Sequence, residues 1–210
     1  MRTFVGSWTC AMPVRYKSFP ALAEREVEGR DYRIGLRKRR GAIVVIAIHG
    51  GGIEAGTSEV ADGIAADDLS FYAFEGIKSR RNRDLHITSH LFDEPQCRAL
   101  VNEAPGVISI HGENSKRQVV FLGGRDRDRL NALRESLTSR GFRLETHKKL
   151  RLQGLDPRNI CNRAKNGCGV QLELSFGLRC SFFKSLSKTG RLSKTERFDL
   201  FVTAVREAVL

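Results

Sequence analysis

Residues Ala42 to Ser58 read A-I-V-V-I-A-I-H-G-G-G-I-E-A-G-T-S, and this stretch decides the fold. Its first seven residues are apolar and mostly β-branched, a short run that is typical of a buried strand. His49 ends the run, three glycines follow, and Glu54 stands five positions after His49. Because glycine lets the backbone turn sharply and admits close neighbours, we expect His49 and Glu54 to reach one metal ion from two sides of this turn.

The glycine turn also fits two simpler interpretations. The histidine can be a hydrogen-bonding residue beside an ordinary loop, and the three glycines can form a phosphate-binding loop. The usual phosphate-binding glycine motifs are absent from the sequence, which weakens the second interpretation.

A second apolar run, from Val107 to Ile110, also ends in a histidine, His111. If the two runs are neighbouring parallel strands, His49 and His111 lie at the same edge of a sheet, where open α/β sheets bind their ligands. Together with Glu54 they supply two imidazoles and one carboxylate. This is a known ligand set of catalytic zinc, with a fourth position left for water.

Four further polar residues are candidates for the same site. Glu173 lies within the strand pattern of Val170–Ser175, and it can be an outward-facing residue, an ion-pair partner of an arginine, or a general base beside a metal, where burial raises its pKa. Asn162, Arg163 and Arg179 lie nearby in the sequence. An arginine can hold a carboxylate through two parallel hydrogen bonds, although surface charge is the simpler interpretation in so basic a chain.

Composition bounds the class of protein. The chain has 210 residues, 40% of them hydrophobic, which suffices for one packed domain over residues 16–210 after a flexible arm over 1–15. The net charge of +12 indicates an anionic partner. The five cysteines form no C-x-x-C pair, which argues against a disulfide framework. No apolar run approaches the roughly 18 residues of a membrane span, and the poor signal-peptide core favours a cytoplasmic protein, or one released on cell lysis.

Strands alternate with helices along the chain, which indicates an α/β protein with a three-layer α/β/α open sandwich and a mixed sheet. We expect strands over residues 42–48, 70–74, 85–88, 107–110, 119–122, 142–146 and 170–175. We expect helices over residues 18–28, 57–66, 95–103, 125–140 and 194–210.

Several motifs resemble the phage-derived poly-γ-glutamate hydrolase family. They are H-G-G-G-I-E-A-G-T-S-E at 49–59, L-H-I-T-S-H-L-F-D-E-P at 85–95, I-S-I-H-G at 108–112, V-V-F-L-G-G at 119–124, L-Q-G-L-D-P-R-N-I-C-N-R at 152–163 and G-V-Q-L-E-L-S-F-G-L-R at 169–179. The resemblance runs in order from about Tyr16 to the C-terminus. Ala55 replaces an expected proline, and His90 is a difference that could lie near the site.

The resemblance implies a zinc-dependent endo-type peptidase acting on poly-γ-glutamate, with an open sandwich related to zinc carboxypeptidases. It places the zinc ligands on His49, Glu54 and His111, and the catalytic carboxylate on Glu173. In the mechanism we expect, Arg163 or Arg179 stabilises the oxyanion of the tetrahedral intermediate. The protein would be a monomer that binds its anionic polymer in a basic groove.

Two other functions compete with this one. A zinc amidase acting on peptidoglycan or on N-acyl amino acids would share the site and differ only in substrate. A basic nucleic-acid-binding module without catalysis would explain the charge equally well. It would not explain two strands that end in histidine, and tryptophan and tyrosine are scarce for base stacking.

Overall fold

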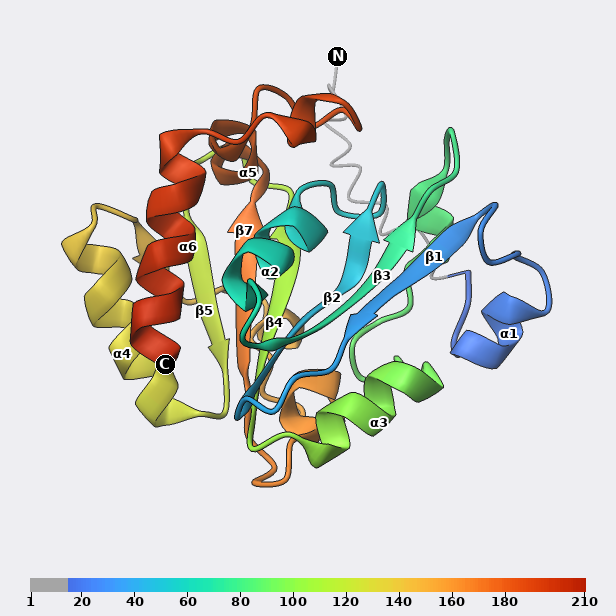
Figure 1. The fold of residues 1–210 in the computed structure, drawn as a ribbon, viewed down its shortest axis with the longest axis horizontal. Coiled ribbons are helices and arrows are strands. Elements are labelled where there is room, and N and C mark those ends of the chain that lie inside the picture. The colour runs from blue at the N-terminus through green and yellow to red at the C-terminus, as the bar shows by residue number, and fades with distance from the viewer. Residues whose placement is uncertain (1–14) are drawn as a thin grey trace, which may run out of the picture.

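A computed structural model of the chain describes residues 15–210, so the expected N-terminal arm lies outside the described residues apart from its last position. A seven-stranded sheet forms the centre, in the order β1-β3-β2-β4-β7-β5-β6 (Figure 1). Its strands are β1 (Tyr32–Arg37), β2 (Ile43–Gly51), β3 (Ser70–Gly76), β4 (Gly106–Glu113), β5 (Val120–Gly124), β6 (Leu144–Glu145) and β7 (Val170–Ser175). β3, β2, β4 and β7 are parallel neighbours, whereas β1 and β5 pair antiparallel with β3 and β7. The expectation of a mixed α/β sheet is confirmed.

Helices cover both faces of the sheet (Figure 1). One face packs against α2 (Thr57–Ala65), α4 (Arg127–Ser139), α5 (Phe176–Phe182) and α6 (Glu196–Val209). The other face packs against α1 (Phe19–Ala23), α3 (Pro95–Glu103) and a 3₁₀ turn at Ile160–Arg163. Further 3₁₀ turns lie at Asn82–Leu85, Leu150–Leu152 and Gly190–Leu192. Across residues 15–210, none of the helices has the length and apolar character that crossing a membrane requires.

The apolar run at the start of β2 is explained by burial on both sides. Ile43, Val45 and Ala47 belong to the core under α2, while Val44 and Ile46 belong to the core under α3. A strand that packs against helices on both faces cannot alternate apolar and polar residues. β2 therefore holds the centre of the sheet and fixes where its carboxyl end, with His49, is presented.

Three of the expected elements differ from the structure. The strand expected at 85–88 is instead the end of a 3₁₀ turn followed by an extended segment, and the helix expected at 18–28 covers only Phe19–Ala23. The strand expected at 142–146 is only two residues long. β1 was not expected, because it is a partly exposed edge strand whose charges and Gly35 hide the strand pattern. α5 was not expected either; it begins directly after β7, where Ser175 caps it by accepting a hydrogen bond from the Leu178 amide.

Candidate metal centre and active-site cavity

Sheet topology brings the predicted residues together. β2 and β4 are parallel neighbours, so their carboxyl ends meet at one edge of the sheet. β4 in turn pairs with β7, and His111 lies opposite Glu173 in that register. The pairing of β2 with β3 shifts register between Ala47 and Gly50, which interrupts the ladder at His49. Two histidines and a buried carboxylate thus converge from three adjacent strands.

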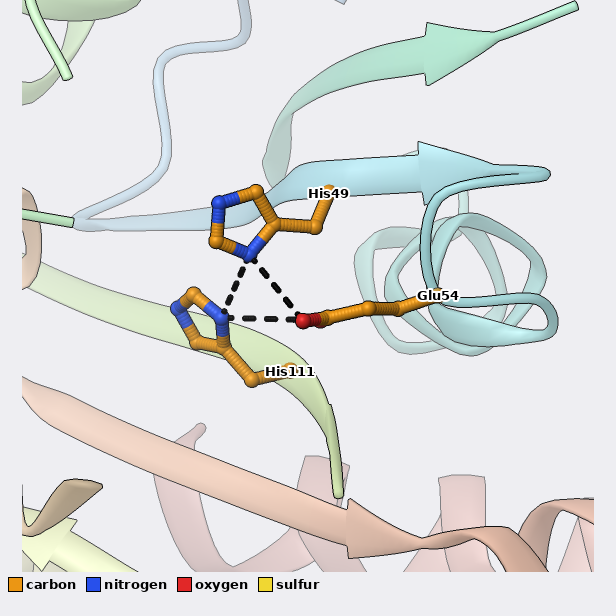
Figure 2. A group of neighbouring side chains, drawn as sticks. All are labelled: His49, Glu54 and His111. Carbon is orange, nitrogen blue, oxygen red and sulfur yellow. Dashed lines mark hydrogen bonds and ion pairs between the residues drawn. The ribbon is translucent and has the colours of Figure 1, made fainter. Parts of the chain in front are cut away.

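His49, Glu54 and His111 form a compact cluster whose ligand atoms all lie within 4.8 Å of one another (Figure 2). The Nδ1 atoms of His49 and His111 are 3.1 Å apart. Glu54 Oε1 lies 3.4 Å from His49 Nδ1, and Glu54 Oε2 lies 3.7 Å from His111 Nδ1. The Gly112 amide donates to Glu54 Oε2 at 2.7 Å and fixes the carboxylate. The metal set predicted from the sequence is therefore assembled in space.

Hydrogen bonds at the far side of each ring decide which nitrogen faces the cluster. His49 Nε2 lies 2.7 Å from the Ile87 carbonyl oxygen, which can only accept, so Nε2 carries the proton and Nδ1 carries a lone pair. His111 Nε2 lies 2.9 Å from Ser109 Oγ, and a hydroxyl that accepts this bond gives His111 the same tautomer. Two nitrogen lone pairs that face each other at 3.1 Å repel unless a cation or a proton lies between them. This arrangement fits a metal ion, and the nitrogen and oxygen donors suit zinc.

Electrostatics at Glu54 agree with a site built for positive charge. Burial by itself would raise the pKa of Glu54. The positive charge of His49 when its ring is protonated, hydrogen bonding to His111 and His49, and the corresponding charge of His111 outweigh burial and hold the pKa of the Glu54 carboxyl well below its usual range. Glu54 is therefore an anion at any pH at which a metal would bind.

Ser109 provides a test of whether the hydrogen bond at the far side of the His111 ring supports metal binding. Replacing it with alanine removes the oxygen partner of His111 Nε2 and leaves every metal-facing atom in place. We expect zinc affinity, measured by competition with a chromogenic chelator, to fall about 10- to 100-fold. The matched control is Ser70→Ala: Ser70 is also buried on a strand, but its hydroxyl bonds the backbone of Arg39. Unchanged affinity in Ser109→Ala, or an equal loss in the control, would contradict the assignment.

Glu173 is a buried carboxyl held by a chain of side-chain amides. The Nε2 of Gln171 donates to Glu173 Oε1 at 2.9 Å, and the Nδ2 of Asn159 donates to Gln171 Oε1 at 2.8 Å. Burial, and next the negative charge of Glu54, raise the pKa of Glu173 to about 8. With one oxygen engaged, Oε2 is the oxygen left to take or give a proton. A carboxyl that can hold a proton near neutral pH is suited to general acid–base chemistry.

A cavity of about 460 Å³ opens over these groups. Its walls come from the strand ends, from residues 86–90 and from residues 149–159. His90, which the sequence singled out, lines it, and so does His86, which the sequence reasoning missed. The His86 ring stacks on His49 with centroids 3.9 Å apart. The positive charge of a protonated His49 ring, followed by burial, lowers the pKa of His86 to about 3, so His86 is a neutral polar group facing the cavity.

Asn162, Arg163 and Arg179 do not line the cavity formed by the described residues, so the structure does not place them for direct contact with its ligand. Arg179 is buried and donates to three backbone carbonyls, those of Leu174 (3.0 Å), Ala55 (2.6 Å) and Glu113 (3.0 Å). It joins the ends of β4 and β7 to the turn that carries Glu54, and is therefore a positioning residue.

Asn162 and Arg163 lie in the structure outside the lining of the cavity. Asn162 is buried and supports the loop of residues 153–159 by donating to the carbonyls of Gly154 (2.7 Å) and Asp156 (2.9 Å). The exposed Arg163 contacts only the Arg158 carbonyl among its recorded hydrogen bonds. The cationic side chains that do line the cavity are Lys149, Arg151 and Arg158. Lys149 and Arg151 belong to the basic run K-K-L-R at 148–151, which the sequence reasoning did not connect with the site.

Comparisons with known proteins place the chain among similar sequences and solved structures. A family model described as poly-gamma-glutamate hydrolase matches residues 16–204. The UPF0714 protein YndL of Bacillus subtilis (strain 168) is 40% identical over 185 residues, covering 87% of this chain and 73% of YndL. A solved structure of bacteriophage poly-gamma-glutamate hydrolase matches with a TM-score of 0.90 and 32% identity, covering 93% of this chain and 96% of that one. An apo, zinc-free structure of YndL matches with a TM-score of 0.87 and 38% identity, covering 94% and 98%.

Proposed function

The chain belongs to the poly-gamma-glutamate hydrolase family, and we propose that it is a zinc-dependent hydrolase of the γ-glutamyl amide bonds of poly-γ-glutamate. One observation carries the proposal: two Nδ1 atoms, 3.1 Å apart, and the Glu54 carboxylate converge beside a protonatable Glu173 in the cavity. We propose His49, Glu54 and His111 as the zinc ligands. The description of one YndL structure as zinc-free supports this choice of metal.

Glu173 is the residue that moves protons in the proposed reaction. Bound at the three ligands, zinc would polarise the amide carbonyl and lower the pKa of water toward 7. Oε2 of Glu173 accepts a proton from the attacking water, while Gln171 donates a hydrogen bond to Oε1. Glu173 then delivers this proton to the nitrogen of the departing amine, which leaves the carboxyl ionised for the next step.

The lining of the cavity supports an anionic substrate. Lys149 and Arg151 are exposed at its rim and, among residues 15–210, form no ion pair. Each residue of poly-γ-glutamate carries one carboxylate, so these cations can hold the chain on one side of the bond to be cut. Arg158 is less available, because it pairs with Asp156 at 2.9 Å. Salt should weaken substrate binding, since exposed charges are screened.

The decisive experiment compares two polymers of equal charge. Purified protein is analysed for zinc and incubated with poly-γ-glutamate or with poly-α-glutamate of the same length, and chain length is followed. We expect about one zinc per chain and shortening of the γ-linked polymer only. Removing the metal with a chelator should abolish the cleavage, and zinc should restore it. Cleavage by metal-free protein would refute the role of zinc, and zinc without cleavage of the γ-polymer would point to another amide substrate.

A further inference from the structure

A second basic surface lies beside the cavity, on the loop of residues 78–83, which we call the basic loop. It reads K-S-R-R-N-R and follows β3 (Figure 1). A hollow of about 380 Å³ lies over it, lined by Arg15, Arg30, Asp31, Lys78, Ser79, Arg80, Arg81 and Asp84. Neither the proposed metal chemistry nor the proton transfer at Glu173 uses these residues.

The surface carries more positive charge than its acidic residues can neutralise. Each acidic side chain already has a basic partner: Asp31 pairs with Arg30 (2.7 Å), Asp84 with Arg81 (2.9 Å), and Glu26 with Lys78 (3.0 Å). Arg80 and Arg83 remain, both exposed, and neither forms an ion pair within residues 15–210. Arginine stays charged at every physiological pH, so this surplus is permanent.

The basic loop is continuous with the rim of the cavity. Arg83 Nη2 donates to Asn114 Oδ1 at 3.0 Å, and Asn114 lines the cavity. The 3₁₀ turn that contains Arg83 leads directly into His86, which also lines the cavity. Lys149 and Arg151 stand on the wall contributed by a different loop. Cations without an ion-pair partner among residues 15–210 therefore lie on one wall of the cavity and on a loop that contacts another part of its lining.

The loop is also held in one shape. Asn82 accepts from the Lys78 amide at 2.9 Å and donates to the Lys78 carbonyl at 2.7 Å, which closes the turn. A Cβ added at Gly52 would lie 2.5 Å from Asn82 Nδ2, and one added at Gly76 would lie 2.7 Å from Asn82 Oδ1. The glycines therefore make room for this amide. A rigid loop loses little conformational entropy when it binds a ligand.

We propose that Arg80 and Arg83 of the basic loop bind carboxylates of the polymer outside the cavity, several residues away from the bond that is cut. The inference rests on the proposed function, since it needs a substrate that is a long polyanion. Single exposed contacts of this kind are weak. The two arginines therefore act on a chain that the cavity already holds, because a carboxylate of a bound chain is present near them at high effective concentration. The surface would thus favour long chains over short ones.

The test is the double variant Arg80→Ser/Arg83→Ser, prepared with zinc bound. We expect KM for a long γ-linked polymer to rise about 3- to 10-fold and its salt dependence to become shallower, with kcat retained. A γ-linked trimer offers few carboxylates beyond those held in the cavity and should show less than about a twofold change in KM. The matched control is Arg127→Ser/Arg134→Ser, which removes the same charge from α4 on the opposite face of the sheet. Equal effects on long and short substrates, or on the control, would overturn the proposal.

A binding measurement separates this inference from the proposed function. Fluorescence anisotropy of a labelled γ-linked polymer, with metal-free protein, reports binding without turnover. If wild type cleaves the polymer, but wild type and Arg80→Ser/Arg83→Ser bind it equally, the proposed function stands and the basic loop is not a binding surface. If wild type neither cleaves nor binds the polymer, the proposed function and the inference about the basic loop are both refuted. If the variant loses affinity only for a DNA oligonucleotide, the surface serves nucleic acid and the proposal is wrong.

Discussion

Replacing Glu173 with glutamine is expected to lower kcat for poly-γ-glutamate by about 10²- to 10⁴-fold and to leave zinc bound. Glutamine has nearly the same shape as glutamate, and its carbonyl oxygen can still accept the hydrogen bond from Gln171. The variant removes only the ability to take a proton from water and pass it to the leaving amine. Zinc content by elemental analysis and turnover by polymer length are measured on the same sample.

The control for this variant is Glu113→Gln, because Glu113 is another carboxylate that lines the cavity. Its side chain accepts a hydrogen bond from the Ser115 amide at 2.6 Å, which gives it a local structural role. We expect Glu113→Gln to retain most of the turnover. Near-normal turnover in Glu173→Gln would remove Glu173 from the mechanism, and loss of zinc together with turnover would assign it to the metal site instead.

The stability of the metal-free protein provides an independent signature of the same residue. Burial raises the pKa of Glu173 to about 8 in the folded chain, against an ordinary value of 4.5. Between these values the folded state retains a proton that the unfolded state releases, so the folded state loses relative stability as pH rises from about 4.5 to 8. Glutamine does not titrate. The free energy of unfolding of metal-free wild type should therefore fall more steeply over this pH window than that of Glu173→Gln.

The cluster of His49, Glu54 and His111 could be predicted from sequence, because the two histidines follow similar strand patterns and such strands end at the same edge of a sheet. A short β-branched run indicates a buried strand, and in an alternating α/β chain two such strands are commonly parallel neighbours. His49 and His111 both follow such runs, so the carboxyl edge of the sheet brings them together. Glu173 did not follow from the residues alone, which left three interpretations open; the family resemblance selected it, and the pairing of β4 with β7 places it opposite His111.

Arg179, His86 and the basic loop show where sequence reasoning stops. Arg179 binds the carbonyl of Ala55 across 124 positions of sequence, and nothing local indicates that a charged residue near a site is buried behind it rather than in it. His86 follows a 3₁₀ turn, so no strand periodicity indicates which way its ring points. The residues that we propose for substrate contact lie on loops, whose shapes depend on tertiary contacts such as those of Asn82 with Lys78.

Replacing His111 with alanine is expected to remove zinc and hydrolysis together. Only His49 and Glu54 would then face the ion, and two protein ligands are fewer than the three on which catalytic zinc sites are built. The strand should persist, because Ile108 and Ile110 beside it are packed in the core and His111 contributes its ring to the cavity. Zinc content, chelator competition and polymer length are measured together, with circular dichroism to verify the fold.

The matched control for His111→Ala is His90→Ala, because His90 lines the same cavity but lies outside the cluster. His90→Ala should keep its zinc. This result would show that the loss of zinc in His111→Ala is specific to His111 and does not follow from removing an imidazole elsewhere in the cavity. Full retention of zinc in His111→Ala would refute the ligand set. A loss no larger than that of Ser109→Ala would mean that His111 supports the ion from outside. The expected order of zinc affinity is therefore wild type and His90→Ala, then Ser109→Ala, then His111→Ala, because only the last variant removes an atom that faces the ion.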